Sequence, residues 1–325
     1  MFTNTSLLHK CINSSLTLIS FQGLNENNWK VVICQVMPFD LWLWRNPLPQ
    51  GNTLRSAAYG NGKYVAVGQY GTIMTSLDGI NWTLQFSGTS IYLTGVAFGA
   101  GLFVAVGMLG TILTSADGEN WTRQDSGTDA WIDGICYGQD MFVAVGQYGQ
   151  IFVSPDGENW GNISIEAYWL SSVAFGNNRF AAVGADGHIF TSDNAKDWVD
   201  QGAQIQYRLN SVVYGNGLFV AVGSGGSVLS SPDGVNWTSR DSNTFARLES
   251  VTYGNGLFVA AGHDDVDPGV VLTSPDGLEW SADISADYKL LLGVLAGPGL
   301  FVAIGQGGII MTSPDAGVWT MRSKG

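Results

Sequence analysis

Aromatic, arginine and acidic residues recur at two neighbouring positions of the chain, on either side of a repeated leucine or isoleucine. Large aromatic and arginine side chains are the usual anchors of binding interfaces, and aromatic rings also stack on the faces of sugars. We expect a ligand-binding surface here; the alternative is that these side chains only plug a channel or vary by drift. The residues are Tyr92, Trp131, Asp133, Trp169, Arg208, Arg247 and Glu249.

Catalysis has little support in the same set of residues. A glycosidase needs two carboxyl groups about 5 to 10 Å apart, whereas Asp133 and Glu249 belong to repeats three units apart. A sialidase-like site would need three clustered arginines, and the candidates belong to the first, fifth and sixth repeats. Those candidates are Arg55, Arg208 and Arg247. No GxSxG motif and no Ser/His/Asp arrangement is visible, so we expect no enzyme and no catalytic residue.

An acidic insertion in the sixth repeat is the one candidate metal site. It follows His263 and holds three carboxylates, Asp264, Asp265 and Asp267, where the first repeat has a short glycine turn. Carboxylate oxygens suit Ca²⁺, but the D-x-D-x-D-G spacing of a calcium loop is absent. We therefore expect a solvated loop, with no metal and no cofactor.

The chain is built from an internal repeat, and repeats decide the fold before any local pattern does. The segment SLDGINW, which ends at Trp82, recurs six times. A second unit, YGNGKYVAVG in the first copy, precedes it each time. The steps between the final tryptophans are 39, 39, 38, 39, 43 and 39 residues. Seven copies therefore cover roughly residues 52 to 325.

Each copy predicts four short antiparallel strands, called A to D in chain order. In the first copy strand A covers residues 54–59 and strand D residues 82–86, with FVAV-like and TIxTS-like segments between them. Runs of this length, rich in Val, Ile, Phe and Tyr and bounded by Gly, Asn and Asp, are typical of strands. One such sheet cannot bury both faces alone. We predict an all-β, seven-bladed β-propeller of four-stranded antiparallel blades; an open solenoid would need capping repeats, and the last copy looks ordinary.

The strand order divides the turns between two rims. The A–B and C–D turns, which are nearly uniform among the copies, share one rim. The D–A and B–C connections share the other rim and vary from copy to copy. A residue that is the same in all copies is required by the geometry of the repeat. A residue that differs between copies is not required by that geometry. We therefore place ligand binding on the rim of the D–A and B–C connections.

The S-x-D-G-x-x-W segment resembles the Asp-box of sialidases and other BNR-type repeat proteins, although it is one residue shorter. The resemblance implies that these residues are structural and lie away from an active face. Copy four departs at Asn194 and Ala195, and copy seven at Ala316, so we expect looser turns there. The structural residues are Asp78, Trp82, Asp117, Trp121, Asp156, Trp160, Asp233, Trp237, Asp276, Trp280, Asp315 and Trp319.

The whole pattern resembles the BNR-like seven-bladed propellers that include photosystem II assembly and stability factors. That resemblance implies a non-enzymatic scaffold. We predict a propeller that binds a protein segment or a glycan. The alternative is an Asp-box carbohydrate-active enzyme, a sialidase-like or xyloglucanase-like glycoside hydrolase, since seven blades also resemble one half of the two-propeller xyloglucanases. A structural surface domain without a ligand is a third possibility.

The amino-acid composition further limits the classes of partner that we expect. Hydrophobic residues make up 45% of the 325 residues and charged residues 13%, which excludes a disordered chain. A net charge of −13 repels phosphate and disfavours nucleic acid and anionic membranes. No apolar run of 18 residues exists, so we expect no membrane span. We expect a monomer that is secreted or periplasmic, although no clear signal peptide is present.

The first part of the chain lies outside the repeat. We predict an N-terminal extension over residues 1–40, which is either loosely packed or the result of a mis-assigned start near Met37, and a propeller over residues 41–325. Residues 29–37 read as a strand. Residues 41–46 resemble a strand D without a blade of its own, and we expect them at the seam between the last and first blades.

Overall fold

The structure, a computed structural model, describes residues 51–165, 168–264, 269–285 and 290–322, and the backbone of four short strands before them. Contacts divide the chain into two units, Met1–Arg45 and Asn46–Gly325. In the first unit β1 (Cys11–Ile12) pairs with β2 (Ser15–Leu16), and β3 (Ile19–Gly23) pairs with β4 (Trp29–Ile33). A strand therefore forms within residues 29–37, and its partner is β3. The predicted place of residues 41–46 lies outside the described residues.

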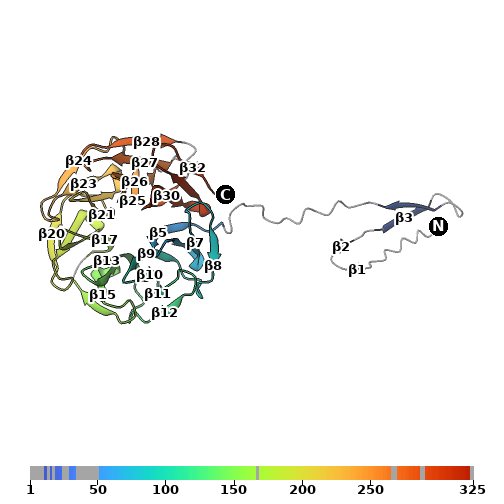
Figure 1. Cartoon of the computed structure of the whole chain (residues 1–325), viewed down its shortest axis with the longest axis horizontal. Helices are drawn as coiled ribbons and strands as arrows, with labels where there is room; N and C mark the ends of the chain where they lie inside the picture. The colour runs from blue at the N-terminus through green and yellow to red at the C-terminus, as the bar shows by residue number, and fades with distance from the viewer. Residues whose placement is uncertain are drawn as a thin grey trace. The chain divides into compact units, whose positions relative to one another are not determined.

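The second unit is a seven-bladed β-propeller, as the repeat predicts (Figure 1). Seven four-stranded sheets follow one another around the ring, and each contains four strands that are consecutive in the chain. All strand pairs within a blade are antiparallel. No helix among the described residues is long and apolar enough to cross a membrane.

The strands of blades one to seven are named by their position in the sheet. The A strands are β5 (Leu54–Gly60), β9 (Leu93–Gly99), β13 (Ile132–Gly138), β17 (Leu170–Gly176), β21 (Leu209–Gly215), β25 (Arg247–Gly254) and β29 (Leu291–Gly297). The B strands are β6 (Lys63–Gly68), β10 (Leu102–Gly107), β14 (Met141–Gly146), β18 (Arg179–Gly184), β22 (Leu218–Gly223), β26 (Leu257–His263) and β30 (Leu300–Gly305). The C strands are β7 (Ile73–Ser76), β11 (Ile112–Ser115), β15 (Gln150–Ser154), β19 (His188–Ser192), β23 (Val228–Ser231), β27 (Gly269–Ser274) and β31 (Ile310–Ser313). The D strands are β8 (Thr83–Gln85), β12 (Thr122–Gln124), β16 (Gly161–Ser164), β20 (Val199–Ala203), β24 (Thr238–Arg240), β28 (Ser281–Ser285) and β32 (Thr320–Met321).

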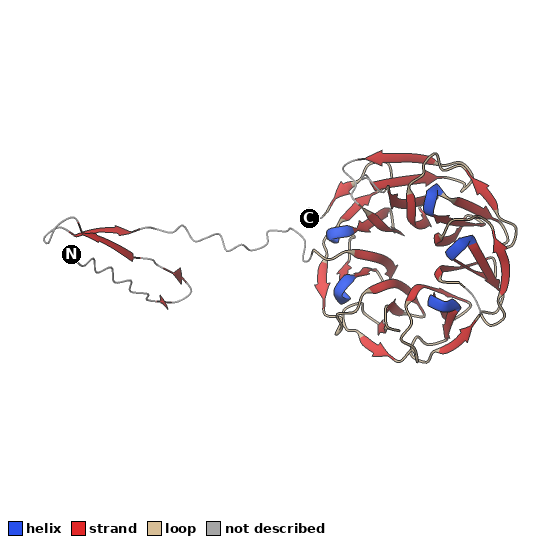
Figure 2. Cartoon of the chain, turned by 180° about the vertical axis from the view of Figure 1, so that it is seen from behind, coloured by secondary structure: helices blue, strands red, loops and turns tan. Residues whose placement is uncertain are grey.

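Because neighbouring strands are antiparallel, the two rims follow the predicted division. The A–B turns and the turns before the D strands lie on one rim, and the B–C and D–A connections lie on the other. Short 3₁₀ turns form five of the B–C connections (Figure 2). They are η1 (Gln69–Gly71), η2 (Gln147–Gly149), η3 (Ala185–Gly187), η4 (Ser224–Gly226) and η5 (Gln306–Gly308).

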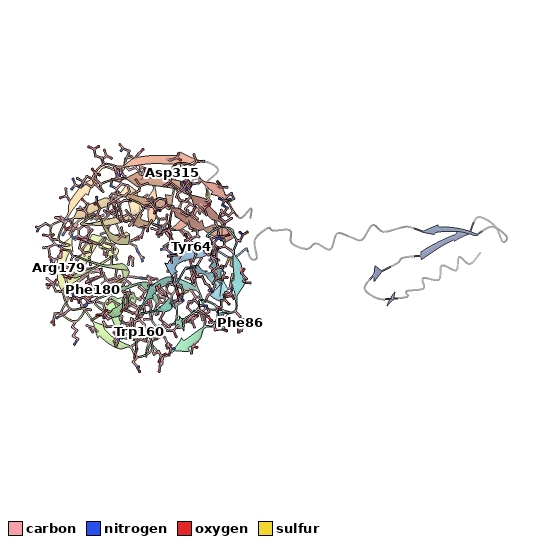
Figure 3. All side chains as sticks on the ribbon, viewed as in Figure 1. Tyr64, Phe86, Trp160, Arg179, Phe180 and Asp315 are labelled. Atoms are coloured by element: carbon pink, nitrogen blue, oxygen red, sulfur yellow. The ribbon has the colours of Figure 1, made fainter. Side chains whose placement is uncertain are left out.

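The hydrophobic core is divided into clusters that lie between blades. Successive residues of a strand face opposite sides of the sheet, so Val65 and Val67 of β6 pack toward blade two, while Tyr64 and Ala66 pack toward blade seven. One cluster joins blade seven to blade one through Val302 and its neighbours. The ring is thus closed by side-chain packing between two complete blades. Figure 3 draws the side chains of the ring and labels Tyr64, a member of this cluster.

A glycine at the end of strand A lets each blade approach the next. In six blades a Cβ added to this glycine would overlap an aromatic side chain of the following blade; in five of them this side chain ends strand A, and for Gly297 of blade seven it is Tyr64 of β6. In blade five, for example, Gly215 faces the ring of Tyr253. Gly254 of blade six faces the methyl group of Ala296 instead. The aromatic residue at the end of strand A therefore sets the spacing of most blades.

The S-x-D-G-x-x-W segments, which we name the aspartate turns, are held by their own side chains. In blade one, Asp78 Oδ1 accepts the backbone N–H groups of Ile80 and Asn81 at 2.8 and 2.7 Å, and Oδ2 accepts the Asn81 side-chain amide at 2.7 Å. These hydrogen bonds, led by those from Asn81, hold the pKa of Asp78 well below its usual range. The indole of Trp82 donates to the carbonyl of Gly79 at 2.9 Å. The aspartate therefore has a structural role.

In copy four the expectation of a looser turn was wrong with respect to these hydrogen bonds, whereas in copy seven Val318 has no side-chain amide to donate to Asp315. In blade four, Asn194 Oδ1 accepts the backbone N–H groups of Lys196 and Asp197 at 2.9 Å, and its amide donates to Asp197 Oδ2 at 2.8 Å. The carboxylate and the amide have exchanged places. Ala195 and Ala316 adopt the left-handed backbone that glycine adopts elsewhere, with φ of 58° and 61°.

Blade four predicts how an aspartate turn tolerates substitution. Asp233→Asn in blade five would set two amides against each other, because Asn236 donates to Asp233 Oδ2. We expect the melting temperature to fall by about 2–4 °C. The double change Asp233→Asn with Asn236→Asp copies blade four and should restore most of the loss. Thermal unfolding followed by circular dichroism measures both; a double variant as unstable as the single one would contradict this account.

Candidate functional site

The A strands place one side chain per blade at the central channel through a β-bulge. Pairing between strands A and B skips the residue after the first leucine or isoleucine in every blade, and a bulge of this kind redirects a side chain. Six of these residues line a cavity of about 210 Å³ on the ring axis. The bulge residues are Arg55, Thr94, Asp133, Ser171, Asn210, Glu249 and Leu292.

The residue two positions before each bulge residue is anchored through its backbone. The carbonyl groups of Trp131 and Trp169 accept N–H groups from the adjoining B–C connections, each at 2.9 Å. Tyr92 and Arg208 are held in the same way at 3.0 Å. A Cβ on the glycine that ends strand B would overlap this carbonyl group, so only glycine fits there. The predicted site residues at the bulge position, and those two positions before it, therefore lie on rigid backbone at the mouth of the channel.

Glu249 is the centre of the first cluster at the mouth. Its side chain is only 4% exposed, and its carboxylate contacts the guanidinium groups of Arg247 at 2.6 Å and Arg55 at 3.3 Å. His263 Nε2 lies 3.5 Å from the same carboxylate. Arg55 belongs to blade one and Glu249 to blade six, and Arg55 also donates to the carbonyl of Leu292 in blade seven at 2.7 Å. Arg55 therefore links three blades across the seam where the ring closes.

The protonation of this cluster follows from its charges. Burial alone would raise the pKa of Glu249, but the hydrogen bond with His263 and the charges of Arg55 and Arg247 outweigh it and lower the pKa below 4.5. The hydrogen bond to Glu249 raises the pKa of His263 above 6.5, against the effect of its partial burial. The pair is thus held in its charged form over a wider pH range than either residue alone.

Asp133 is the centre of the second cluster. Its carboxylate accepts a hydrogen bond from the indole of Trp169 and lies 3.7 Å from the guanidinium group of Arg208. Arg208 also donates to the hydroxyl of Ser171 at 2.9 Å, and its Cζ lies 5.2 Å from the centre of the Trp169 ring. Trp131 meets Trp169 edge to face at 5.4 Å. Burial raises the pKa of Asp133, while the Trp169 hydrogen bond and the charge of Arg208 oppose the rise.

The structure therefore brings six of the seven predicted site residues into two charge clusters. Tyr92 lies at the same mouth, where burial raises the pKa of its phenol, and makes no ring contact with the two tryptophans among the contacts of the described residues. Asp133 and Glu249 are in separate clusters, and no described contact joins them.

Two participants were missed as site residues. Arg55 occupies the bulge position of blade one, so its side chain follows the same rule as Asp133 and Glu249. His263 was treated only as the start of an acidic insertion, yet it extends β26 opposite Arg247. The predicted metal candidates Asp265 and Asp267 lie outside the described residues. Among the residues that the structure does describe, no group of three metal-binding side chains occurs.

The side chains of the two clusters carry more positive than negative charge, in contrast to the whole chain. Three arginines and a histidine with a raised pKa face two carboxylates, although the chain carries a net charge of −13. Arg247 keeps 49% of its side chain exposed and Arg208 36%. A guanidinium group has five N–H donors, and these two have donors to offer a ligand that approaches from solvent. The mouth is therefore suited to an anionic or hydrogen-bond-accepting ligand.

Comparisons with known proteins agree with the fold. No family model matches the chain, and no curated protein matches it. A solved structure of YCF48 bound to a D1 peptide is 20% identical with a TM-score of 0.66, over 82% of this chain and 92% of that one. YCF48 from Cyanidioschyzon merolae is 18% identical with a TM-score of 0.65, over 84% and 98%. The WD40 β-propeller domain of Doa1 is 14% identical with a TM-score of 0.67, over 81% and 93%. At these identities the likeness concerns the fold, and the chain is structurally similar to known β-propellers.

Proposed function

We propose that this propeller is a non-enzymatic module that binds a linear, acidic protein segment at the mouth of its channel. The observation that carries the proposal is the cationic mouth in an acidic protein, built on rigid backbone by blades one, five and six. Electrostatic complementarity of this kind speeds association and selects the partner. The two tryptophans next to Arg208 add the aromatic character of interface anchors. A similar propeller, YCF48, has been solved with a bound peptide, which supports the choice of a protein segment.

Panning a displayed library of random linear peptides against the immobilised chain tests the proposal. We expect the selected peptides to be enriched in Asp and Glu, and their affinity to fall as salt rises. Arg247→Gln should weaken binding about tenfold, whereas Arg123→Gln should have no effect. Arg123 is a matched control because it lies exposed on the outer strand β12. Peptides without acidic enrichment, or equal effects of the two variants, would refute the proposal.

The competing function is that of a carbohydrate-active enzyme. Its test is turnover of fluorogenic sialosides and β-glucans by the purified chain. We expect none, because Asp133 and Glu249 each have their own cationic partners in separate clusters. Turnover that Asp133→Ala abolishes would overturn the non-enzymatic proposal.

A further inference from the structure

Exposed aromatic side chains mark the rim of the B–C and D–A connections. Tyr70 and Tyr148 are about 70% exposed at the tips of B–C connections, and Phe86 (labelled in Figure 3) and Phe245 are about 90% exposed in D–A connections. On the opposite rim the exposed large hydrophobic side chains of the described residues are aliphatic. They are Leu77, Ile80, Leu278 and Val318. Aromatic side chains are enriched at protein interfaces, so the aromatic rim is the one suited to docking.

A groove opens on this rim over blade five. It has a volume of about 680 Å³ and is flanked by the exposed rings of Tyr207 and Phe245. The tip of η4 forms part of its lining through Gly225, and a Cβ on that glycine would lie 3.4 Å from the Tyr207 ring. The tips of blades one and three carry Tyr70 and Tyr148 in the same left-handed conformation. At the tip of blade five, no side chain therefore stands beside the Tyr207 ring.

The related hollow over blade two has a different character. It is lined by Leu109, Arg123, Asp125 and Asp129. Asp129 stands two residues before Trp131, as Phe245 stands two residues before Arg247. Asp125 has an equivalent in the groove over blade five, Asp241, so the two places differ in the second carboxylate, Asp129, which Phe245 replaces over blade five.

The groove over blade five is formed by loops that also carry residues of the cationic mouth. Tyr207 is followed directly by Arg208, and Phe245 is followed two residues later by Arg247. Ser224, the first residue of η4, donates its N–H to the carbonyl of Arg208 at 3.0 Å. The same loops that form the groove therefore carry two of the arginines of the mouth.

We propose that the acidic segment bound at the mouth continues outward over blade five and places an apolar side chain between Tyr207 and Phe245. This inference rests on the proposed function and adds the second recognition element of its ligand. The acidic residue would select the partner by charge, and the apolar residue would bury the two exposed rings. Burial of an aromatic anchor in an interface changes affinity by about tenfold or more.

The test compares peptides selected from one displayed random library by the wild-type chain and by Gly225→Tyr. The substitution places at this tip the residue that blades one and three already carry there. Wild-type selections should share an acidic residue and an apolar residue at a fixed spacing. Selections on Gly225→Tyr should keep the acidic residue and lose the fixed apolar position. A wild-type peptide should bind Gly225→Tyr about tenfold more weakly.

Two further variants complete the design. Gly307→Tyr is the matched control, because Gly307 has the same left-handed conformation at the tip of blade seven, with open space around it. It should leave affinity unchanged. Phe245→Ala should weaken binding of the same peptide as Gly225→Tyr does, without disturbing the fold, since its ring is exposed.

The outcomes separate the two proposals. An acidic preference without a fixed apolar position in the wild-type selections would overturn the groove and leave the mouth intact. An apolar position that persists on Gly225→Tyr would also overturn the groove. The absence of any acidic preference would overturn the proposed function itself. Binding to a glycan array that is lost in Phe245→Ala, with no peptide selected, would assign the groove to carbohydrate instead and refute this inference.

Discussion

Glu249→Gln should lower the free energy of unfolding by about 3 kcal/mol, because it removes the charge that three cationic side chains share. Glu249 is buried, and Arg55, Arg247 and His263 all approach its carboxylate. With glutamine in its place these cations would repel one another in a partly desolvated site. Urea unfolding measures the effect. Glu158→Gln, a change of the same kind on the exposed surface, should leave stability unchanged.

The free energy of unfolding that Glu249→Gln removes should depend on pH in a defined way. The lowered pKa of Glu249 gives a contribution that is present above 4.5 and is lost as the pH falls through the folded-state value. The raised pKa of His263 gives a contribution that is present below 6.5 and is lost as the pH rises through its folded-state value. The difference between wild type and variant should therefore be largest between pH 4.5 and 6.5. A difference below about 1 kcal/mol there would show that the cluster contributes little.

Gly215→Ala should destabilise the propeller by about 2–3 kcal/mol through overpacking. The added methyl group would overlap the ring of Tyr253 and force blades five and six apart. Gly217→Ala, two residues later, tests a different cause. Its φ is 76° with open space around it, so we expect only the cost of a left-handed alanine, about 1 kcal/mol.

A double variant distinguishes overpacking from a general loss of strand stability. Tyr253→Gly removes both the ring and the Cβ that Gly215→Ala would strike, so the two changes together should cost less than their sum. The Cβ matters as well as the ring, since Gly254 of blade six faces the methyl group of Ala296. Strictly additive losses in urea unfolding would contradict the spacing role assigned to this contact.

The fold could be predicted because each copy repeats the same local information. Strand A was predicted over residues 54–59 and is found over Leu54–Gly60, and the seven copies give seven blades. Local hydrogen bonds also explain why the departure at Asn194 was misjudged. Asn194 and Asp197 carry the amide and the carboxylate in exchanged places, and this preserves the turn. Comparing the copies one position at a time misses the exchange, because it involves both residues.

The positions of the site residues could be predicted from the sequence, but the contacts between them could not. Trp131, Asp133 and Glu249 are at the mouth because the repeat aligns them. The contact of Arg55 with Glu249 depends on closure of the ring and on a side chain that reaches past blade seven, which no pattern within one copy contains. The role of His263 was missed because its contact with Glu249 requires β26 to extend one residue further than the other B strands, up to the acidic insertion.

Each blade takes its four strands from one uninterrupted stretch of chain, and this has a consequence for biosynthesis. A nascent chain can complete a blade before the ribosome begins the next one, since every strand pairs only with the strands synthesised directly before or after it. Long-range assembly is then deferred to a single late event, the docking of the last blade on the first. The side chain of Arg55, made early, would wait through the synthesis of nearly the whole ring before it meets Glu249 and Leu292.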